Sequence, residues 1–125
     1  MQENRAPYTG FMAEPPDRGS FARVVLTTAA NPEEGERIGR ILVEEHLAAC
    51  VTQVPSVRSI YRWEGKVADS DETLLLIKTG VDQLAALEAR LHAVHSYRTP
   101  EFLVLEVTGG SAAYLEWMQA SLSGG

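Results

Sequence analysis

The histidines are the side chains of this sequence best suited to metal binding, and two of the three lie close together. His92 and His95 are three residues apart, so on a helix both imidazoles lie on one face and can reach one metal ion. Two ligands are too few to define a site, and an exposed polar pair is the simpler interpretation. His46 follows Glu45 near the expected end of a helix, where a positive charge is favourable. The histidines by themselves therefore define no metal site.

Cys50 is the only cysteine, which excludes an internal disulfide. A packed thiol is the simpler interpretation, because a redox or soft-metal role requires neighbours that lower the pKa of the thiol. A hydrolase or redox enzyme built on Cys50 or Glu101 stays as an open alternative. The sequence lacks a glycine-rich phosphate loop, a nucleophile elbow, Cys-x-x-Cys and His-Glu-x-x-His. We therefore expect a protein that is not an enzyme and that carries no catalytic residue.

Aromatic and charged side chains form a second candidate for chemistry, a small-molecule cleft. The aromatic candidates are Tyr61, Trp63 and Tyr97, and the polar ones are Glu64, Lys66, Lys78, Arg98 and Glu101. A few charges among aromatic rings are what a ligand pocket needs. The same residue types are enriched at subunit contacts, so an interface is an equally good interpretation of the aromatics. The two interpretations are compatible.

The apolar pattern predicts the elements that position these side chains. They are a strand over 23–29, a helix from 32 to near 46, strands over 50–63 and 66–79, a helix from 79 to about 95, a strand over 102–107 and a short helix after Ser111. Asn31 and Ser111 are expected helix caps, and Thr79 with Asp82 fits a capping box. The order β-α-β-β-α-β with a terminal helix predicts a ferredoxin-like α+β sandwich.

The stretch from Cys50 to Thr79 predicts one long hairpin. Its arms of about 14 residues measure about 46 Å at roughly 3.3 Å per residue, about twice the usual strand length. Pro55 cannot donate to a ladder, so it marks a bulge or an edge. The arms and the sheet face without long helices exceed what one chain covers, which favours burial between subunits.

The turn of this hairpin decides its register. If Trp63 and Lys66 flank a two-residue turn, Arg58 lies opposite Asp71, a favourable pair. Glu64 is poorly suited to the positive φ of such a turn, so we expect a longer loop or a bulge there.

Composition bounds the domain and its partners. The 125 residues fit one domain over 21–125, and the Pro- and Gly-interrupted segment 1–20 is expected to be a flexible or surface-draped tail. The formal charge of -6 disfavours binding to nucleic acid and to anionic membranes. No apolar N-terminal run resembles a signal peptide or a membrane span. We therefore expect a cytoplasmic protein with no membrane partner.

Five segments, in order and at matching spacing over 23–122, resemble the CutA family of divalent-cation tolerance proteins. They are Leu47-Ala48-Ala49-Cys50-Val51, Ser59-Ile60-Tyr61-Arg62-Trp63-Glu64-Gly65-Lys66, Ile77-Lys78-Thr79, Tyr97-Arg98-Thr99-Pro100-Glu101 and Tyr114-Leu115-Glu116-Trp117. The resemblance implies a ferredoxin-like fold and a homotrimer similar to the PII signalling proteins. It also implies that the hairpin pairs between subunits through residues 61–66: Tyr61, Arg62, Trp63, Glu64, Gly65 and Lys66.

The family is associated with tolerance to copper and other divalent ions. The ligand positions proposed for it correspond here to Thr27, Val94 and His95, so His95 is the one candidate metal ligand. The resemblance thus implies no obligatory cofactor, with copper or another divalent cation as a weakly bound ligand. Our leading hypothesis is a non-enzymatic, trimeric protein of copper tolerance or metal ion response. The alternative is a PII-like signalling module that binds a small molecule at a subunit cleft near Trp63, Lys78, Tyr97 and Glu101.

Overall fold

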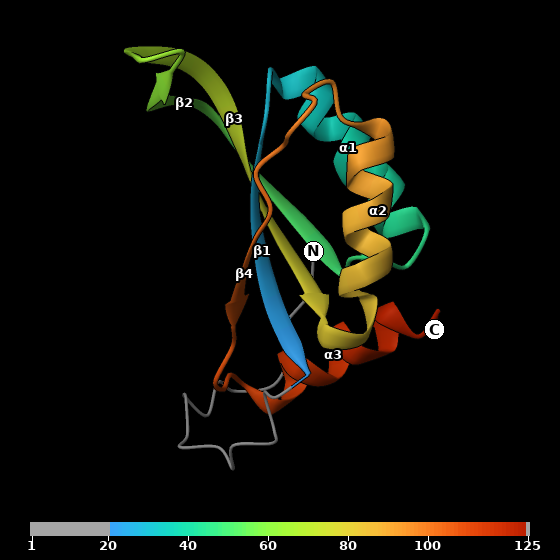
Figure 1. Ribbon diagram of the computed structural model, residues 1–125. Helices are drawn as coiled ribbons and strands as arrows, with labels where there is room; N and C mark the ends of the chain where they lie inside the picture. Colours follow the sequence, from blue (N-terminus) through green and yellow to red (C-terminus); the bar gives the residue numbers. More distant parts are fainter. Residues whose placement is uncertain (1–20, 125) are drawn as a thin grey trace.

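The computed structural model describes residues 21–124, and its elements follow the predicted order (Figure 1). They are β1 (Ala22–Ala29), α1 (Pro32–Glu44), β2 (Cys50–Trp63), β3 (Lys66–Gly80), the 3-10 helix η1 (Val81–Gln83), α2 (Leu84–Val94), β4 (Leu103–Glu106) and α3 (Ala112–Leu122). The tail predicted over 1–20 lies outside these residues. No helix within 21–124 is long and apolar enough to cross a membrane.

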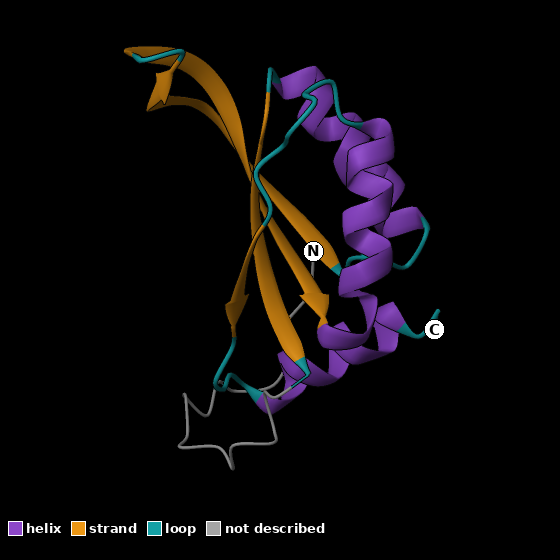
Figure 2. Ribbon diagram, viewed as in Figure 1, coloured by secondary structure: helices purple, strands orange, loops and turns teal. Residues whose placement is uncertain are grey.

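The four strands form one sheet in the order β2-β3-β1-β4, and every neighbouring pair is antiparallel. Helices α1 and α2 lie side by side over one face of this sheet, and α3 lies at its lower end (Figure 2). This arrangement confirms the predicted ferredoxin-like α+β fold.

Helix α1 begins as predicted and ends early. The Asn31 side chain accepts a hydrogen bond from the Glu34 backbone amide at 2.8 Å, and Pro32 occupies the first helical position. The helix ends at Glu44, two residues before the predicted end, and His46 already has a φ of 60°. Ser111 caps α3 as predicted, because its side chain accepts from the Tyr114 amide at 3.3 Å.

The predicted capping box at the start of α2 is wrong. Thr79 belongs to β3, is fully buried, and donates its hydroxyl proton to the Leu47 carbonyl at 2.7 Å. Thr79 thus lies inside the strand, and neither the 3-10 turn that follows nor α2, which begins at Leu84, has a side-chain cap.

The hairpin is as long as the sequence predicts, with 14 residues in β2 and 15 in β3. Trp63 pairs with Lys66 and Arg58 with Asp71, which is the register that a two-residue turn requires. The register shifts between Val54 and Val57, so the predicted bulge at Pro55 is also confirmed.

The expectation of a longer loop at the tip is wrong. Glu64 and Gly65 alone form the turn, with φ angles of 50° and 79°. Positive φ at both central residues is the pattern of a type I′ turn, whose twist matches that of the flanking strands. This match outweighs the cost of about 1 kcal/mol for holding a non-glycine residue in the left-handed region.

The core lies between the sheet and the two long helices. Val25 of β1 and Leu75 and Ile77 of β3 are fully buried against α1 and α2. Successive strand residues point to opposite faces. Leu74, Leu76 and Lys78 therefore lie on the other face, which we call the open face, because α1 and α2 do not cover it and, within residues 21–124, α3 packs only at its lower end.

The open face is apolar across three strands. Leu26 and Val24 of β1 lie on it beside Leu103 and Leu105, their partners in β4, and these two are 57% and 48% exposed. An exposed apolar patch over several strands is typical of a contact surface.

The two turn residues allow a paired test of this geometry. We expect Glu64→Asn to raise the free energy of unfolding by about 1 kcal/mol, because Asn tolerates the left-handed region. Gly65→Ala should lower it by a similar amount, and purely through the backbone, since nothing lies within 4 Å of an added Cβ. Chemical denaturation of both variants measures the difference, and a loss of stability in both would contradict the type I′ turn.

Candidate functional site

The predicted cleft residues lie apart in one chain. Trp63 is 63% exposed at the hairpin tip, opposite Lys66. Lys78 lies twelve residues further along the same extended strand, near its other end, and such a stretch spans about 40 Å at roughly 3.3 Å per residue. Tyr97 and Glu101 lie in the segment between α2 and β4. A single chain therefore does not bring Trp63 and Lys78 into one site.

Tyr97 and Glu101 do converge, on a residue that the sequence did not point to. The Tyr97 hydroxyl donates to Glu72 Oε2 at 2.7 Å, and burial, reinforced by this carboxylate, raises the pKa of Tyr97. Burial also raises the pKa of Glu101, and the charge of Glu72 raises it further. The three side chains form what we call the Glu72 cluster. Only its strand position marks Glu72 in the sequence, because its partners lie 25 or more residues away.

Glu34 holds the segment that carries Tyr97. Its carboxylate is 6% exposed and accepts backbone amides from Ala30 at 2.9 Å and from Ser96 at 2.7 Å. Burial alone raises the pKa of Glu34, but these hydrogen bonds outweigh it, and the pKa lies below its ordinary value. Glu34 thus joins the start of α1 to the residues that follow α2.

His95 uses both ring nitrogens inside the protein. Nδ1 accepts the Tyr97 amide at 2.9 Å, so Nε2 carries the proton and donates to the Thr28 carbonyl at 2.7 Å. The imidazole is fully buried and lies 4.7 Å from the Tyr97 ring, between centroids. In this conformation neither nitrogen has a lone pair free for a metal ion.

The other positions of the implied copper site add no ligand. The Thr27 hydroxyl is buried without a hydrogen-bond partner, and Val94 is apolar. His92 is exposed. Across the described part of the chain, no group of three or more His, Cys, Asp or Glu side chains is arranged to hold a metal ion. The described donors therefore do not fit a resident copper ion.

Cys50 lies at the base of the hairpin, directly opposite Lys78. The thiol is half-buried rather than fully packed, and Lys78 Nζ lies 3.8 Å from its sulfur. Lys78 also donates to the Thr52 hydroxyl. Burial raises the pKa of the nearby Tyr114, and Cys50 adds to this effect.

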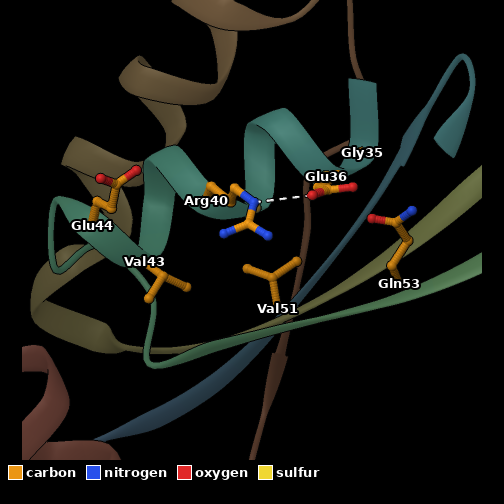
Figure 3. Close-up of a pocket in the computed structure, with 8 residues that line it drawn as sticks. Gly35, Glu36, Arg40, Val43, Glu44, Val51 and Gln53 are labelled. Carbon is orange, nitrogen blue, oxygen red and sulfur yellow. Dashed lines mark hydrogen bonds and ion pairs between the residues drawn. The ribbon is translucent and has the colours of Figure 1, made fainter. Parts of the chain in front are cut away.

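A groove of about 480 Å³ lies between α1 and β2, and none of the site residues described above lines it. Figure 3 shows Arg40 of α1 reaching toward Glu36, at 3.0 Å, above Val51 and Gln53 of β2. Gly35 and Gly39 let the helix approach the strand, since a Cβ on Gly35 would lie 3.2 Å from the Gln53 amide oxygen. The volume suits a small ligand, but its one cation is already paired with Glu36.

The fold and these sites define a class: a ferredoxin-like α+β domain whose polar clusters lie on and beside an uncovered sheet face. The family model described as CutA1 divalent ion tolerance protein matches residues 23–121. This chain therefore belongs to the CutA1 divalent ion tolerance protein family.

Named relatives agree with this assignment. The divalent-cation tolerance protein CutA of Pectobacterium atrosepticum is 46% identical over 101 residues, which cover 81% of this chain and 92% of the relative. The chloroplastic protein CutA of Arabidopsis thaliana is 46% identical over 98 residues, 78% of this chain, and this match spans 54% of the plant protein. The crystal structure of CutA from Xylella fastidiosa superposes with a TM-score of 0.81 at 41% identity, covering 82% of this chain and 99% of that one.

The bonds of Glu34 predict a pH-dependent contribution to stability. At neutral pH we expect Glu34→Gln to lower the free energy of unfolding by about 1–3 kcal/mol, because one buried amide loses its acceptor. The pKa of Glu34 is lowered in the folded state, so its contribution is present above the ordinary value of 4.5 and is lost as the pH falls through the folded pKa. Denaturation of wild type and variant at several pH values measures the difference between their free energies of unfolding.

Glu33→Gln is the matched control, since Glu33 is exposed on the same helical turn. It should change stability by less than about 0.5 kcal/mol. A gap between wild type and Glu34→Gln that stays the same at about pH 3 and about pH 7 would contradict the role given to Glu34.

Proposed function

We propose that this protein is a homotrimeric divalent-cation tolerance protein that acts in the response to copper or another divalent cation, without catalysing a reaction. Membership of the CutA1 family supports the link to divalent cations. The single cysteine supports the cytoplasm as its compartment, because disulfides are rare there.

The observation that carries the assembly is the open face together with the overhanging hairpin. Leu103 and Leu105 continue the apolar surface of β1 and β3, and in the described chain only α3 packs against this face, at its lower end. Beyond Ala29 and Thr73, the last pair between β1 and β3, the hairpin arms extend without a third strand. Neighbouring copies of the chain would bury both features.

Metal binding in this proposal is weak. Both nitrogens of His95 are hydrogen-bonded to backbone groups, and a metal ion would have to replace one of them. Thr27 and Val94 offer no strong ligand beside it. The protein would then respond to metal without holding an obligatory ion.

The hairpin gives a direct test of the assembly. Removal of residues 61–68, with a two-residue turn joining Ile60 to its partner Asp69, should convert the trimer into a smaller species, because the tip residues are the proposed contacts. Sedimentation measures the mass, and circular dichroism confirms that the shortened chain is folded. Glu64→Asn, which keeps both arms, is the control. A folded, shortened chain that still sediments as a trimer would rule out the hairpin as the element that holds the assembly.

Copper titration tests the metal part of the proposal. By isothermal titration with copper(II), we expect no submicromolar site, since the described donors do not converge. His92→Ala serves as the control for an exposed histidine. Submicromolar binding that His95→Ala abolishes and His92→Ala leaves intact would overturn the assignment of weak binding.

The second candidate function is a PII-like signalling or small-molecule-binding module. The Glu72 cluster favours it, because carboxylates and a phenol converge there with raised pKa values at Tyr97 and Glu101. Trp63 and Lys78 would complete such a cleft only from neighbouring subunits, since one chain holds them apart.

A further inference from the structure

Lys78 is a charged residue in an apolar surface. It lies on the open face of β3, with Val24 of β1 on one side, Cys50 of β2 on the other and Leu76 before it on the same face. Its side chain is half-buried already in the single chain. Tyr114 of α3 lies near Cys50 beside it, so a layer that continues from α3 over β3 also covers this ammonium group.

Lys78 also has no carboxylate partner among the described residues. Within residues 21–124, five arginines form ion pairs with Asp or Glu, whereas Lys78 forms none. The other described cations without a carboxylate partner are Arg62, Lys66 and Arg98, and all three are exposed to water. Lys78 is therefore the half-buried cation whose charge the described chain does not neutralise.

The donors around Lys78 are only partly used. The ammonium group has three N–H donors, and its neighbours are the Thr52 hydroxyl and the Cys50 sulfur. One ammonium donor is left. Thr52 accepts from Lys78, and its hydroxyl also lies 3.9 Å from the Cys50 sulfur, in a contact where either atom can be the donor. Sulfur is a weak acceptor, so a carboxylate oxygen can replace it as the partner of the Thr52 hydroxyl proton. Two donors from adjacent strands thus flank the same part of the open face.

A covered face changes the energetics of this group. Water solvates an exposed ammonium group, whereas burial of the charge without a counter-ion is costly. One ammonium and one hydroxyl supply a single positive charge and two donors. They match one carboxylate better than a phosphate monoester, which carries a charge of about −1.5 to −2 at pH 7.

We propose that Lys78 and Thr52 form a carboxylate-binding site that the assembled protein buries against the open face. The proposal rests on the proposed assembly and names the ligand chemistry of its subunit cleft. The carboxylate comes either from an Asp or Glu side chain of a second copy or from a small free carboxylic acid. Both sources place the same group against the same two donors.

The two lysines of the chain allow a matched experiment, because Lys66 at the hairpin tip is exposed and carries the same charge. Thermal midpoints and sedimentation are measured for wild type, Lys78→Met, Lys66→Met and Lys78→Arg, in sodium acetate and in sodium chloride of equal ionic strength. A free carboxylate predicts a saturable rise of the midpoint in acetate for wild type and Lys66→Met, which is lost in Lys78→Met and retained in part in Lys78→Arg.

A carboxylate from a second copy predicts a different pattern that also supports the site. Acetate then has no effect, and Lys78→Met weakens subunit association about tenfold or more, because it leaves a buried carboxylate unpaired, whereas Lys66→Met does not. Thr52→Val should reproduce either effect in weaker form, and it keeps the proposal testable if Lys78→Met does not fold.

Two results overturn the proposal, and sedimentation tells them apart. A wild type that assembles normally, with neither acetate nor the substitutions at 78 and 52 changing its midpoint or association, would overturn the carboxylate site alone. A wild type that sediments only as a monomer would overturn the assembly and the site together.

Discussion

Strand β3 carries apolar side chains on both of its faces, and the long helices cover only one of them. Leu75 and Ile77 are fully buried against α1 and α2, while Leu74 and Leu76 belong to the open face. Because β3 pairs with β1 on one side and β2 on the other, it fixes the register of the hairpin and the position of Lys78 together. The apolar face of this strand that α1 and α2 leave uncovered is thus the constraint on which the proposed assembly rests.

Glu34 supplies the second constraint, which fixes the segment between α2 and β4. Its two carboxylate oxygens accept amides from Ala30 and Ser96, so it fixes the chain just after α2. That anchor sets His95 against the Thr28 carbonyl and Tyr97 against Glu72. The Glu72 cluster therefore depends on Glu34, although the hydrogen bonds of this buried carboxylate go to Ala30 and Ser96 and not to the cluster.

Local patterns predicted the fold, and long-range contacts account for most of what the sequence missed. The hairpin register follows from pairs such as Trp63 with Lys66, which are set by the turn between them. The role of Thr79 depends on the Leu47 carbonyl, 32 residues earlier, so its spacing to Asp82 was misleading. The convergence on Glu72 depends equally on contacts between segments distant in sequence. At Glu64 the twist of the strands prevailed over the preference of the residue.

His95 connects these structural roles to the question of metal. A metal ion at Nε2 would displace the Thr28 carbonyl, and one at Nδ1 would displace the Tyr97 amide. Either exchange leaves a buried backbone group without its partner, at a cost of about 1–3 kcal/mol. Loss of the bond at Nδ1 would also disturb the residue whose hydroxyl binds Glu72. A histidine that fixes the chain in this way is a poor ligand, so a metal ion at His95 would have to compete with the hydrogen bonds of the fold.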